Sequence, residues 1–210
     1  LRLRLLLHKT IYRFFKLLLK YPFKWLYRTT VIGAENEPAA PYIACANHSS
    51  FVDPFLEGLA LREQVSYIAK ASLQRFRIIH WFFKTVGVIP IHRDESDVAA
   101  IRTSVNALRE GRTVGIYPQG TRIPYRVPEP GEAMGGLGLL ATMSHCPVLP
   151  IAIVTKAHKP KLLRKTIIVI GKPLTEEDFR ELGEHPRKPE IASFCFAEVA
   201  RLYKEAYATL

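Results

Sequence analysis

The sequence predicts an α/β protein whose central mixed sheet is flanked by helices, with a basic, amphipathic two-helix segment at the N-terminus. Three observations support this prediction. Short apolar runs typical of buried strands alternate with amphipathic patterns typical of helices, which favours a sheet with helices on its faces. A cluster of polar residues, 47–53, directly follows one of the apolar runs. Residues 1–28 contain eight basic side chains and no acidic one.

The N-terminal segment has the charge pattern of an amphipathic helix. Its basic residues recur at intervals of three or four, which places them on one helical face; they are Lys9, Arg13, Lys16, Lys20 and Lys24. Large apolar residues lie on the opposite side, namely Leu3, Leu7, Ile11, Phe14, Leu18 and Trp25. No apolar run approaches the ~20 residues needed to span a bilayer. Pro22 is expected to break or kink the pattern, which would give two helices.

A segment of this kind is typical of helices in a membrane interface, where each cation near an anionic surface contributes about 1 kcal/mol. The alternatives are a helix packed on the protein with its lysines in water, or a calmodulin-target or nucleic-acid-binding helix. The segment supplies +8 of the net charge of +11, so the remainder carries only +3. That remainder has no basic stripe with interleaved aromatic residues, which argues against a nucleic-acid partner. We therefore expect residues 1–28 to dock on an anionic membrane surface and residues 29–210 to form a single α/β domain.

The domain itself is predicted as strands and helices in alternation. The predicted strands are residues 29–34, 42–46, 65–69, 88–91, 113–117, 148–155 and 166–170. The predicted helices are residues 54–62, 72–85, 95–110, 133–144 and 190–207. The helix at 95–110 has apolar residues on one face and is ended by Gly111, whereas three glycines weaken the pattern at 133–144.

The polar cluster follows the buried run 42–46, at the strand end where α/β folds place their ligands. It contains His48 and Asp53, with four residues between them. In a loop that enters a helix, this spacing lets the carboxylate turn back onto the imidazole and fix its tautomer. The other ring nitrogen is then free to accept a proton from a substrate hydroxyl. The alternative is structural: a polar side chain among residues 47–50 caps a helix that begins near Pro54, and Asp53 supports its N-terminus.

Asn47-His48, followed by Asp53, resembles the first sequence block of the glycerolipid acyltransferases, the family of 1-acylglycerol-3-phosphate acyltransferases. Three further blocks resemble those of the family in the same order. They are Lys-Ala-Ser-Leu at 70–73 with Gly-Val-Ile-Pro-Ile-His-Arg at 87–93, Tyr-Pro-Gln-Gly-Thr-Arg at 117–122, and Cys-Pro-Val-Leu-Pro-Ile-Ala-Ile at 146–153.

The resemblance implies transfer of a fatty acyl group from acyl-CoA or acyl carrier protein to the hydroxyl of lysophosphatidic acid, giving phosphatidic acid. His48 would be the general base, and Asp53 would orient it and stabilise its charged form, as in a serine-protease triad. The acceptor phosphate needs positive charge and backbone amides. The resemblance assigns it to Arg93 and Arg122, with a pocket shaped by Gly120 and Thr121 and with Lys70 as a weaker candidate. No cofactor and no metal is implied.

Within the third block, one position departs from the family pattern, and a second departure follows the block, where Tyr125-Arg126-Val127 stands in place of the Lys-Gly pair that the family often has. Gln119 stands where the family usually has Glu, so the side chain keeps its shape and loses its charge, and we expect activity to survive. Other hypotheses for the chain are an acyltransferase for another lysolipid or for glycerol 3-phosphate, or an idle module that binds anionic lipid. A metal-dependent hydrolase with His48 and Asp53 as ligands lacks a further ligand cluster. We expect a peripheral or monotopic protein on the cytoplasmic face of a membrane, such as a bacterial inner membrane.

Overall fold

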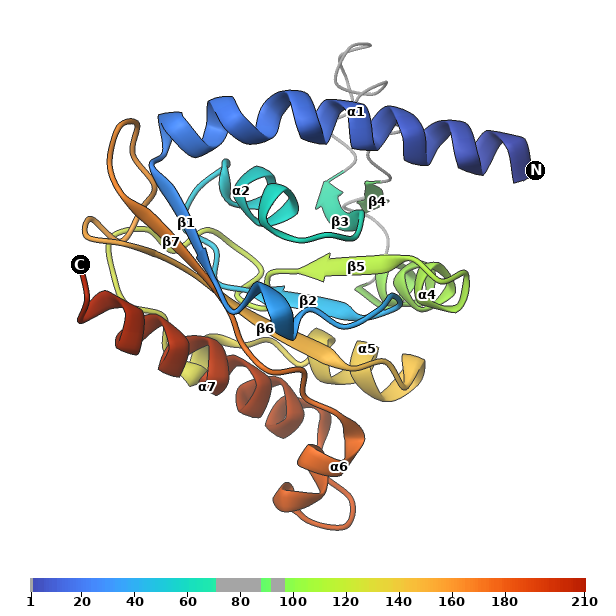
Figure 1. Cartoon of the computed structure of the whole chain (residues 1–210). Coiled ribbons are helices and arrows are strands. Elements are labelled where there is room, and N and C mark those ends of the chain that lie inside the picture. Colours follow the sequence, from blue (N-terminus) through green and yellow to red (C-terminus); the bar gives the residue numbers. More distant parts are fainter. Residues whose placement is uncertain (1, 71–87, 92–96) are drawn as a thin grey trace.

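The computed structural model describes residues 2–70, 88–91 and 97–210. The strands within these ranges form one seven-stranded sheet in the order β1-β7-β6-β2-β5-β3-β4 (Figure 1). Neighbouring strands are parallel, apart from the antiparallel pair β6 and β7. The mixed sheet predicted from the sequence is therefore confirmed. The strands are β1 Thr29–Ile32, β2 Ile43–Ala46, β3 Val65–Lys70, β4 Ile89–Ile91, β5 Thr113–Ile116, β6 Val148–Thr155 and β7 Thr166–Ile170.

Helices cover both faces of this sheet. The described helices are α1 Arg2–Leu26, α2 Asp53–Ala60, α4 Asp97–Arg109, α5 Gly136–Ser144, α6 Glu176–Phe179 and α7 Lys188–Tyr207. Short 3-10 turns are formed by Ala34–Asn36, Pro130–Glu132 and Arg180–Leu182. Helices α1 and α2 lie over one face of the sheet, and α5 and α7 lie over the other (Figure 1). The helix predicted at 72–85 falls outside the described residues.

The central strand β2 is buried on both faces, as expected of a parallel strand covered by two helical layers. Its side chains alternate between two apolar cores. Ile43 and Cys45 join the core that includes residues of α5 and α7, whereas Ala44 and Ala46 join the core that includes Leu56 of α2. Packing on both sides fixes the end of β2, and the polar cluster begins at the next residue.

Helix α1 corrects one prediction, because it continues through Pro22 as a single helix instead of two. Proline removes the one backbone hydrogen bond that residue 22 would donate, and the rest of the 25-residue helix is continuous to Leu26. The turn that follows is held by aromatic packing. The ring of Phe23 lies 5.8 Å from that of Tyr27 and 6.1 Å from that of Phe55, and both pairs are stacked.

The orientation of α1 also differs from that of a helix that packs its apolar side on the protein and leaves its lysines in water. One predicted basic residue faces the protein, since Nζ of Lys16 donates hydrogen bonds to the carbonyls of Leu61 and Arg62, where α2 ends. Burial lowers the pKa of Lys16 to about 8. Large apolar side chains of α1 face solvent instead, with exposed fractions of 62% for Phe14, 65% for Leu17, 57% for Leu18, 67% for Tyr21 and 72% for Trp25. Among the described residues, no helix combines the length and apolar character that crossing a membrane requires.

Candidate active site

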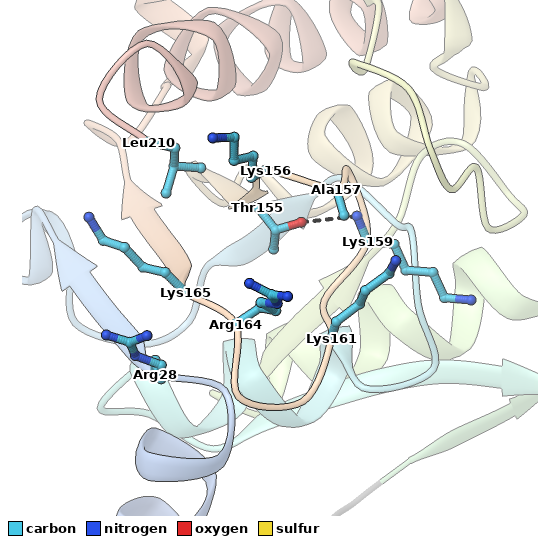
Figure 2. A pocket seen from close by; sticks show the side chains of 9 residues that line it. All are labelled: Arg28, Thr155, Lys156, Ala157, Lys159, Lys161, Arg164, Lys165 and Leu210. Carbon is cyan, nitrogen blue, oxygen red and sulfur yellow. Dashed lines mark hydrogen bonds between the residues drawn. The ribbon is translucent and has the colours of Figure 1, made fainter.

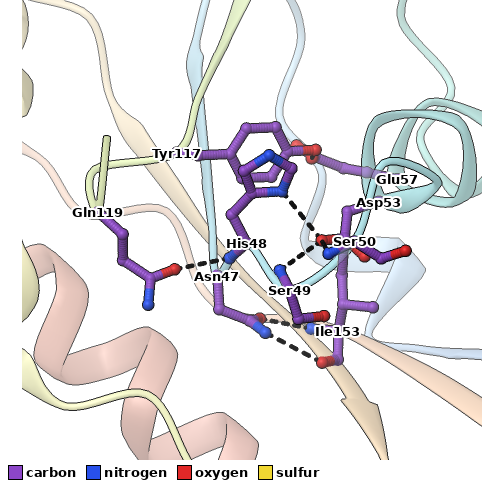
Figure 3. Close-up of polar contacts among 9 residues, drawn as sticks. All are labelled: Asn47, His48, Ser49, Ser50, Asp53, Glu57, Tyr117, Gln119 and Ile153. Atoms are coloured by element: carbon purple, nitrogen blue, oxygen red, sulfur yellow. Dashed lines mark hydrogen bonds and ion pairs between the residues drawn. The ribbon is translucent and has the colours of Figure 1, made fainter. Parts of the chain in front are cut away.

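His48 and Asp53 are in contact at the carboxyl end of β2. Nδ1 of His48 lies 3.0 Å from Oδ2 of Asp53, and the carboxylate is fully buried while 18% of the imidazole side chain is exposed (Figure 3). A carboxylate can only accept a hydrogen bond, so Nδ1 carries the proton in this contact. Nε2 of the neutral ring is then left with a free lone pair, which is what a general base needs.

Asp53 also organises the loop that carries the imidazole. The same oxygen, Oδ2, accepts hydrogen bonds from the backbone N–H groups of Ser49 and Ser50, each at 2.6 Å. Helix α2 begins at Asp53 with Pro54 in its first turn and has no side-chain cap at Val52. The capping alternative from the sequence is therefore wrong for the polar loop residues, because the carboxylate receives their backbone donors.

Asn47 anchors the loop to the neighbouring strand. Its side-chain amide accepts a hydrogen bond from the N–H of Ile153 at 2.8 Å and donates one to the carbonyl of the same residue at 3.1 Å. The amide thereby takes the place of a backbone peptide and continues the pairing of β2 with β6. This contact fixes the start of the loop immediately before His48.

A half-buried aromatic residue lies against the imidazole ring. The rings of His48 and Tyr117 are stacked, with centroids 4.2 Å apart and planes inclined by 18° (Figure 3). The Tyr117 hydroxyl donates a hydrogen bond of 2.6 Å to Oε2 of Glu57, which is fully buried one helical turn after Asp53. Burial, together with the charge of Asp53, raises the pKa of Glu57 to about 8. Burial also raises the pKa of the Tyr117 hydroxyl well above its ordinary value.

A glycine in β5 makes room for this aromatic stack. A Cβ at Gly115 would lie 2.5 Å from ring atoms of Tyr67, which itself stacks on Tyr117 with centroids 6.0 Å apart. Any larger residue at position 115 would push the Tyr67 ring away. The absence of a side chain there thus allows the layer of rings behind His48 to form.

The third sequence block wraps around the backbone of His48. The N–H of His48 donates to Oε1 of Gln119 at 2.6 Å, and its carbonyl accepts from the N–H of Ile123 at 2.7 Å. These two bonds hold residues 119–123 beside the imidazole. Gly120 lies between them with φ +65°, a left-handed conformation that favours glycine. A Cβ there would also lie 2.5 Å from Sδ of Met134.

Gln119 leads to a short chain of polar contacts. Its Nε2 donates a hydrogen bond of 2.6 Å to Oε2 of Glu132, and the other oxygen of Glu132 pairs with the guanidinium of Arg126. Gln119 is buried and the Glu132 side chain is 10% exposed. The amide of Gln119 therefore provides one acceptor, for His48, and one donor, for Glu132. A glutamate at position 119 would instead place its carboxylate against that of Glu132 in a buried position.

The structure also brings Arg122 beside the first block. Its guanidinium carbon lies 3.4 Å from the centroid of the Phe51 ring, which belongs to the His48 loop. Gly120, Thr121 and Arg122 are all exposed, so a ligand can reach them. A guanidinium placed over an aromatic ring still has N–H groups that can donate to a ligand, which suits an anionic one.

For two of the predicted site residues, the structure describes no side-chain contact. Arg93 falls outside the described residues. Lys70 is the last residue of β3, and its side chain is likewise outside the described part. Because β3 runs parallel to β5, Lys70 is at the carboxyl edge of the sheet, the same edge that carries His48.

Sequence reasoning missed three contributors to the site, which are Glu57, Tyr117 and Glu132. A signal existed for the first, because Glu57 follows Asp53 by four residues in a helix and must share its face. The partners of Tyr117 lie far along the chain, whereas those of Glu132 lie 13 and 6 residues before it in a segment without α-helix or strand, so no spacing rule points to either. Within the described ranges, no group of three or more His, Cys, Asp or Glu side chains could hold a metal ion.

Comparisons with known proteins show what this chain resembles. A family model described as Acyltransferase matches residues 28–154. A Bacillus subtilis protein named 1-acyl-sn-glycerol-3-phosphate acyltransferase is 32% identical over 167 residues, covering 78% of this chain and 80% of that protein. A chloroplast protein of the same name from Brassica napus is 29% identical over 137 residues, covering 63% of this chain and 38% of the longer relative.

A solved structure shares the fold. The crystal structure of the 1-acyl-sn-glycerophosphate (LPA) acyltransferase from Thermotoga maritima superposes with a TM-score of 0.76, covering 98% of this chain and 83% of that one. The two sequences are 24% identical. At that identity the likeness establishes the architecture of the chain, and the chemistry has to be argued from the side chains.

Proposed function

The chain belongs to the acyltransferase family, and we propose that it moves a fatty acyl group to the free hydroxyl of lysophosphatidic acid. The donor is a thioester, acyl-CoA or acyl carrier protein, and the product is phosphatidic acid, so the protein acts in phospholipid synthesis. The names of the relatives support this acceptor. The observation that carries the mechanism is the 3.0 Å contact between Nδ1 of His48 and the buried carboxylate of Asp53.

His48 is the general base in this proposal. Nε2 takes the proton of the acceptor hydroxyl as its oxygen attacks the thioester carbonyl carbon. A C–O bond forms, the carbonyl becomes a tetrahedral oxyanion, and the C–S bond then breaks. The imidazolium returns its proton to the departing thiolate, so a free thiol leaves and the base is regenerated. Asp53 holds the reactive tautomer and stabilises the imidazolium, in the manner of the acid in a hydrolase triad.

Arg122 and Arg93 bind the phosphate of the acceptor. The position of Arg122 on the Phe51 ring, next to the His48 loop, supports its part in this assignment. Gly120 and Thr121 shape the pocket, and Lys70 is an additional cation at the same edge of the sheet. A guanidinium pairs with two phosphate oxygens at once, which fixes the orientation of the acceptor as well as its affinity.

The protein works on a membrane surface and attaches through α1. The exposed apolar side chains of this helix, together with its lysines and arginines, support an interfacial position on an anionic bilayer. The attachment is peripheral or monotopic, on the cytoplasmic face. No cofactor is needed, because the thioester supplies the energy of the transfer and His48 supplies the proton chemistry.

The deciding experiment measures product. Purified protein is mixed with labelled oleoyl-CoA, or with oleoyl-acyl carrier protein, and lysophosphatidic acid in anionic vesicles. We expect phosphatidic acid from the parent, none above background from His48→Ala, and a loss of about 10³- to 10⁴-fold in kcat from Asp53→Asn, which misplaces the tautomer.

Each alternative has its own outcome in this assay. Equal rates in the parent and in His48→Ala would remove the imidazole from the mechanism. Product only with glycerol 3-phosphate or another lysolipid would keep the mechanism and change the acceptor. If no donor and acceptor pair gives product while the protein still binds vesicles, the chain is a lipid-binding module.

A further inference from the structure

The loop between β6 and β7 forms one side of a strongly basic hollow. The hollow has a volume of about 440 Å³, and Figure 2 shows its side chains. Its charged lining consists of Arg28, Lys156, Lys159, Lys161, Arg164 and Lys165. In the part of the chain that the structure describes, none of these six cations forms an ion pair with an acidic side chain. So much unpaired positive charge around one hollow favours an anionic ligand.

The tip of the same hairpin exposes two adjacent leucines. Leu162 is 59% exposed and Leu163 is 55% exposed, and both neighbouring residues in the chain, Lys161 and Arg164, are cations. Leu163 has φ +59°, a left-handed conformation that a leucine rarely adopts. Its N–H donates a hydrogen bond of 2.7 Å to the carbonyl of Leu26, which holds this conformation. Sparsely populated backbone conformations that are held in place in this way point to a functional constraint.

This hydrogen bond joins the hairpin tip to the end of α1. The hairpin rises beside the C-terminal end of that helix (Figure 1). Trp25, the residue before Leu26, is 72% exposed. The leucines of the tip therefore continue the exposed apolar surface of α1, and Arg28 brings the end of α1 into the lining of the basic hollow.

We propose that the β6–β7 hairpin is a second membrane-docking element, with Leu162 and Leu163 in the bilayer interface and the basic hollow around the phosphate of an anionic lipid headgroup. Apolar side chains flanked by cations are the chemistry of interfacial binding. An acidic protein would be attracted by the same cations, but it would not require two leucines projecting beside the apolar side of α1. The proposal extends the membrane attachment proposed for α1, and it does not depend on acyl transfer.

The test measures binding of the full chain to vesicles without any substrate. One set of vesicles contains phosphatidylcholine and phosphatidylglycerol, and the other contains phosphatidylcholine alone. The charge variant is Lys161→Gln/Arg164→Gln/Lys165→Gln, and its matched control, Arg109→Gln/Lys172→Gln/Arg180→Gln, removes three exposed cations outside the hairpin. We expect the charge variant to lose about 100-fold in affinity for the anionic vesicles, and the control to lose far less.

A second variant tests the leucines. Leu162→Asn/Leu163→Asn removes the apolar tip while keeping a residue that tolerates the left-handed conformation at 163. We expect it to bind both kinds of vesicle more weakly than the parent. Thermal unfolding followed by circular dichroism checks that both hairpin variants remain folded, as the exposure of residues 161–165 implies.

Equal vesicle affinities of the charge variant and its control would overturn the proposal. So would a charge variant that keeps vesicle binding and loses turnover only with acyl carrier protein as donor, because the hollow would then bind an acidic protein. Failure of the parent to form phosphatidic acid would leave the vesicle result unaffected, so the two proposals fail separately.

Discussion

The side-chain amide of Gln119 makes two contacts that need opposite chemistry. Oε1 accepts from the N–H of His48, and Nε2 donates to Glu132. Glutamate at this position keeps the first contact and replaces the second with two carboxylates in a buried site. We expect Gln119→Glu to lower the free energy of unfolding by about 1–3 kcal/mol at pH 8, and by less at pH 5, where one carboxylate can take up a proton. Denaturant unfolding at the two pH values measures this.

A second substitution identifies the cause. In the Gln119→Glu background, Glu132→Gln restores a donor opposite the new carboxylate, so most of the lost stability should return. If the double variant is no more stable than Gln119→Glu, the repulsion between the two carboxylates is not the reason. The contact with Glu132 also explains why a glutamine fits position 119. Its Nε2 group donates to Glu132, and an ionised glutamate has no such donor.

Glu57 should make stability depend on pH in an unusual direction. Its pKa is raised to about 8 in the folded protein by burial and is near 4.3 in an unfolded chain. Between these values the folded state holds a proton that the unfolded state has lost, so the stability contributed by Glu57 falls as pH rises through this window. We expect the free energy of unfolding of Glu57→Gln, relative to that of the parent, to increase by up to about 1 kcal/mol per pH unit between pH 5 and pH 8.

Chemical denaturation of the two proteins across this range provides the measurement. Gln can still accept the hydrogen bond from Tyr117, so the packing behind His48 is retained. A stability difference that stays constant with pH would show that Glu57 is ionised in the folded protein.

At the scale of single elements, α1 leaves several large apolar side chains uncovered. Leu17 and Leu18 are 65% and 57% exposed, so replacing them does not disturb the packing of the helix on the sheet. We expect Leu17→Ser/Leu18→Ser to weaken binding to anionic vesicles about tenfold or more, because the lost apolar area no longer enters the interface. Vesicle sedimentation compares it with Met143→Ser/Leu182→Ser, which changes two exposed apolar residues elsewhere. Equal losses of vesicle affinity in the two double variants would show that α1 has no specific part in membrane binding.

The sequence could indicate that α1 is amphipathic, but it could not indicate how the helix packs. Periodicity placed the lysines on one side and the apolar residues on the other, which is a property of the helix alone. The orientation depends on the partner: the carbonyls that end α2 need donors, and Lys16 provides them. The prediction that Pro22 divides the helix failed in a similar way. It used only the local effect of proline, and the packing of Phe23 on Phe55 next to it cannot be inferred from the local pattern.

At the scale of the whole molecule, the strands were predictable and their order was not. Apolar runs mark β2, β5, β6 and β7, but nothing in a run tells which neighbour it pairs with. The same limit applies to the site. The spacing of His48 and Asp53 predicted their contact because both belong to one loop and the helix after it. Gln119 meets His48 across 71 residues, and Asn47 meets Ile153 across 106.

The arrangement of the molecule also relates the site to the proposed membrane surface. The N–H of Tyr125 donates to the carbonyl of His158 at 3.2 Å, so the segment that follows Arg122 is joined to the β6–β7 hairpin. That hairpin is joined in turn to the end of α1 through Leu163 and Leu26. The loops around His48 and the elements proposed to dock on lipid are thus parts of one connected end of the protein.

The way in which residues 119–123 are attached has a consequence for divergence among related enzymes. Both bonds to His48 use the backbone of that residue, and their partners are Gln119 and the N–H of Ile123. Positions 121 and 122 lie between these anchors and take no part in them. Substitutions at these two positions in a duplicated copy can therefore change the acceptor preference of the enzyme without disturbing His48 or the two hydrogen bonds that hold its backbone. A randomised library at 121 and 122 should accordingly yield mostly folded proteins with altered choice of acceptor.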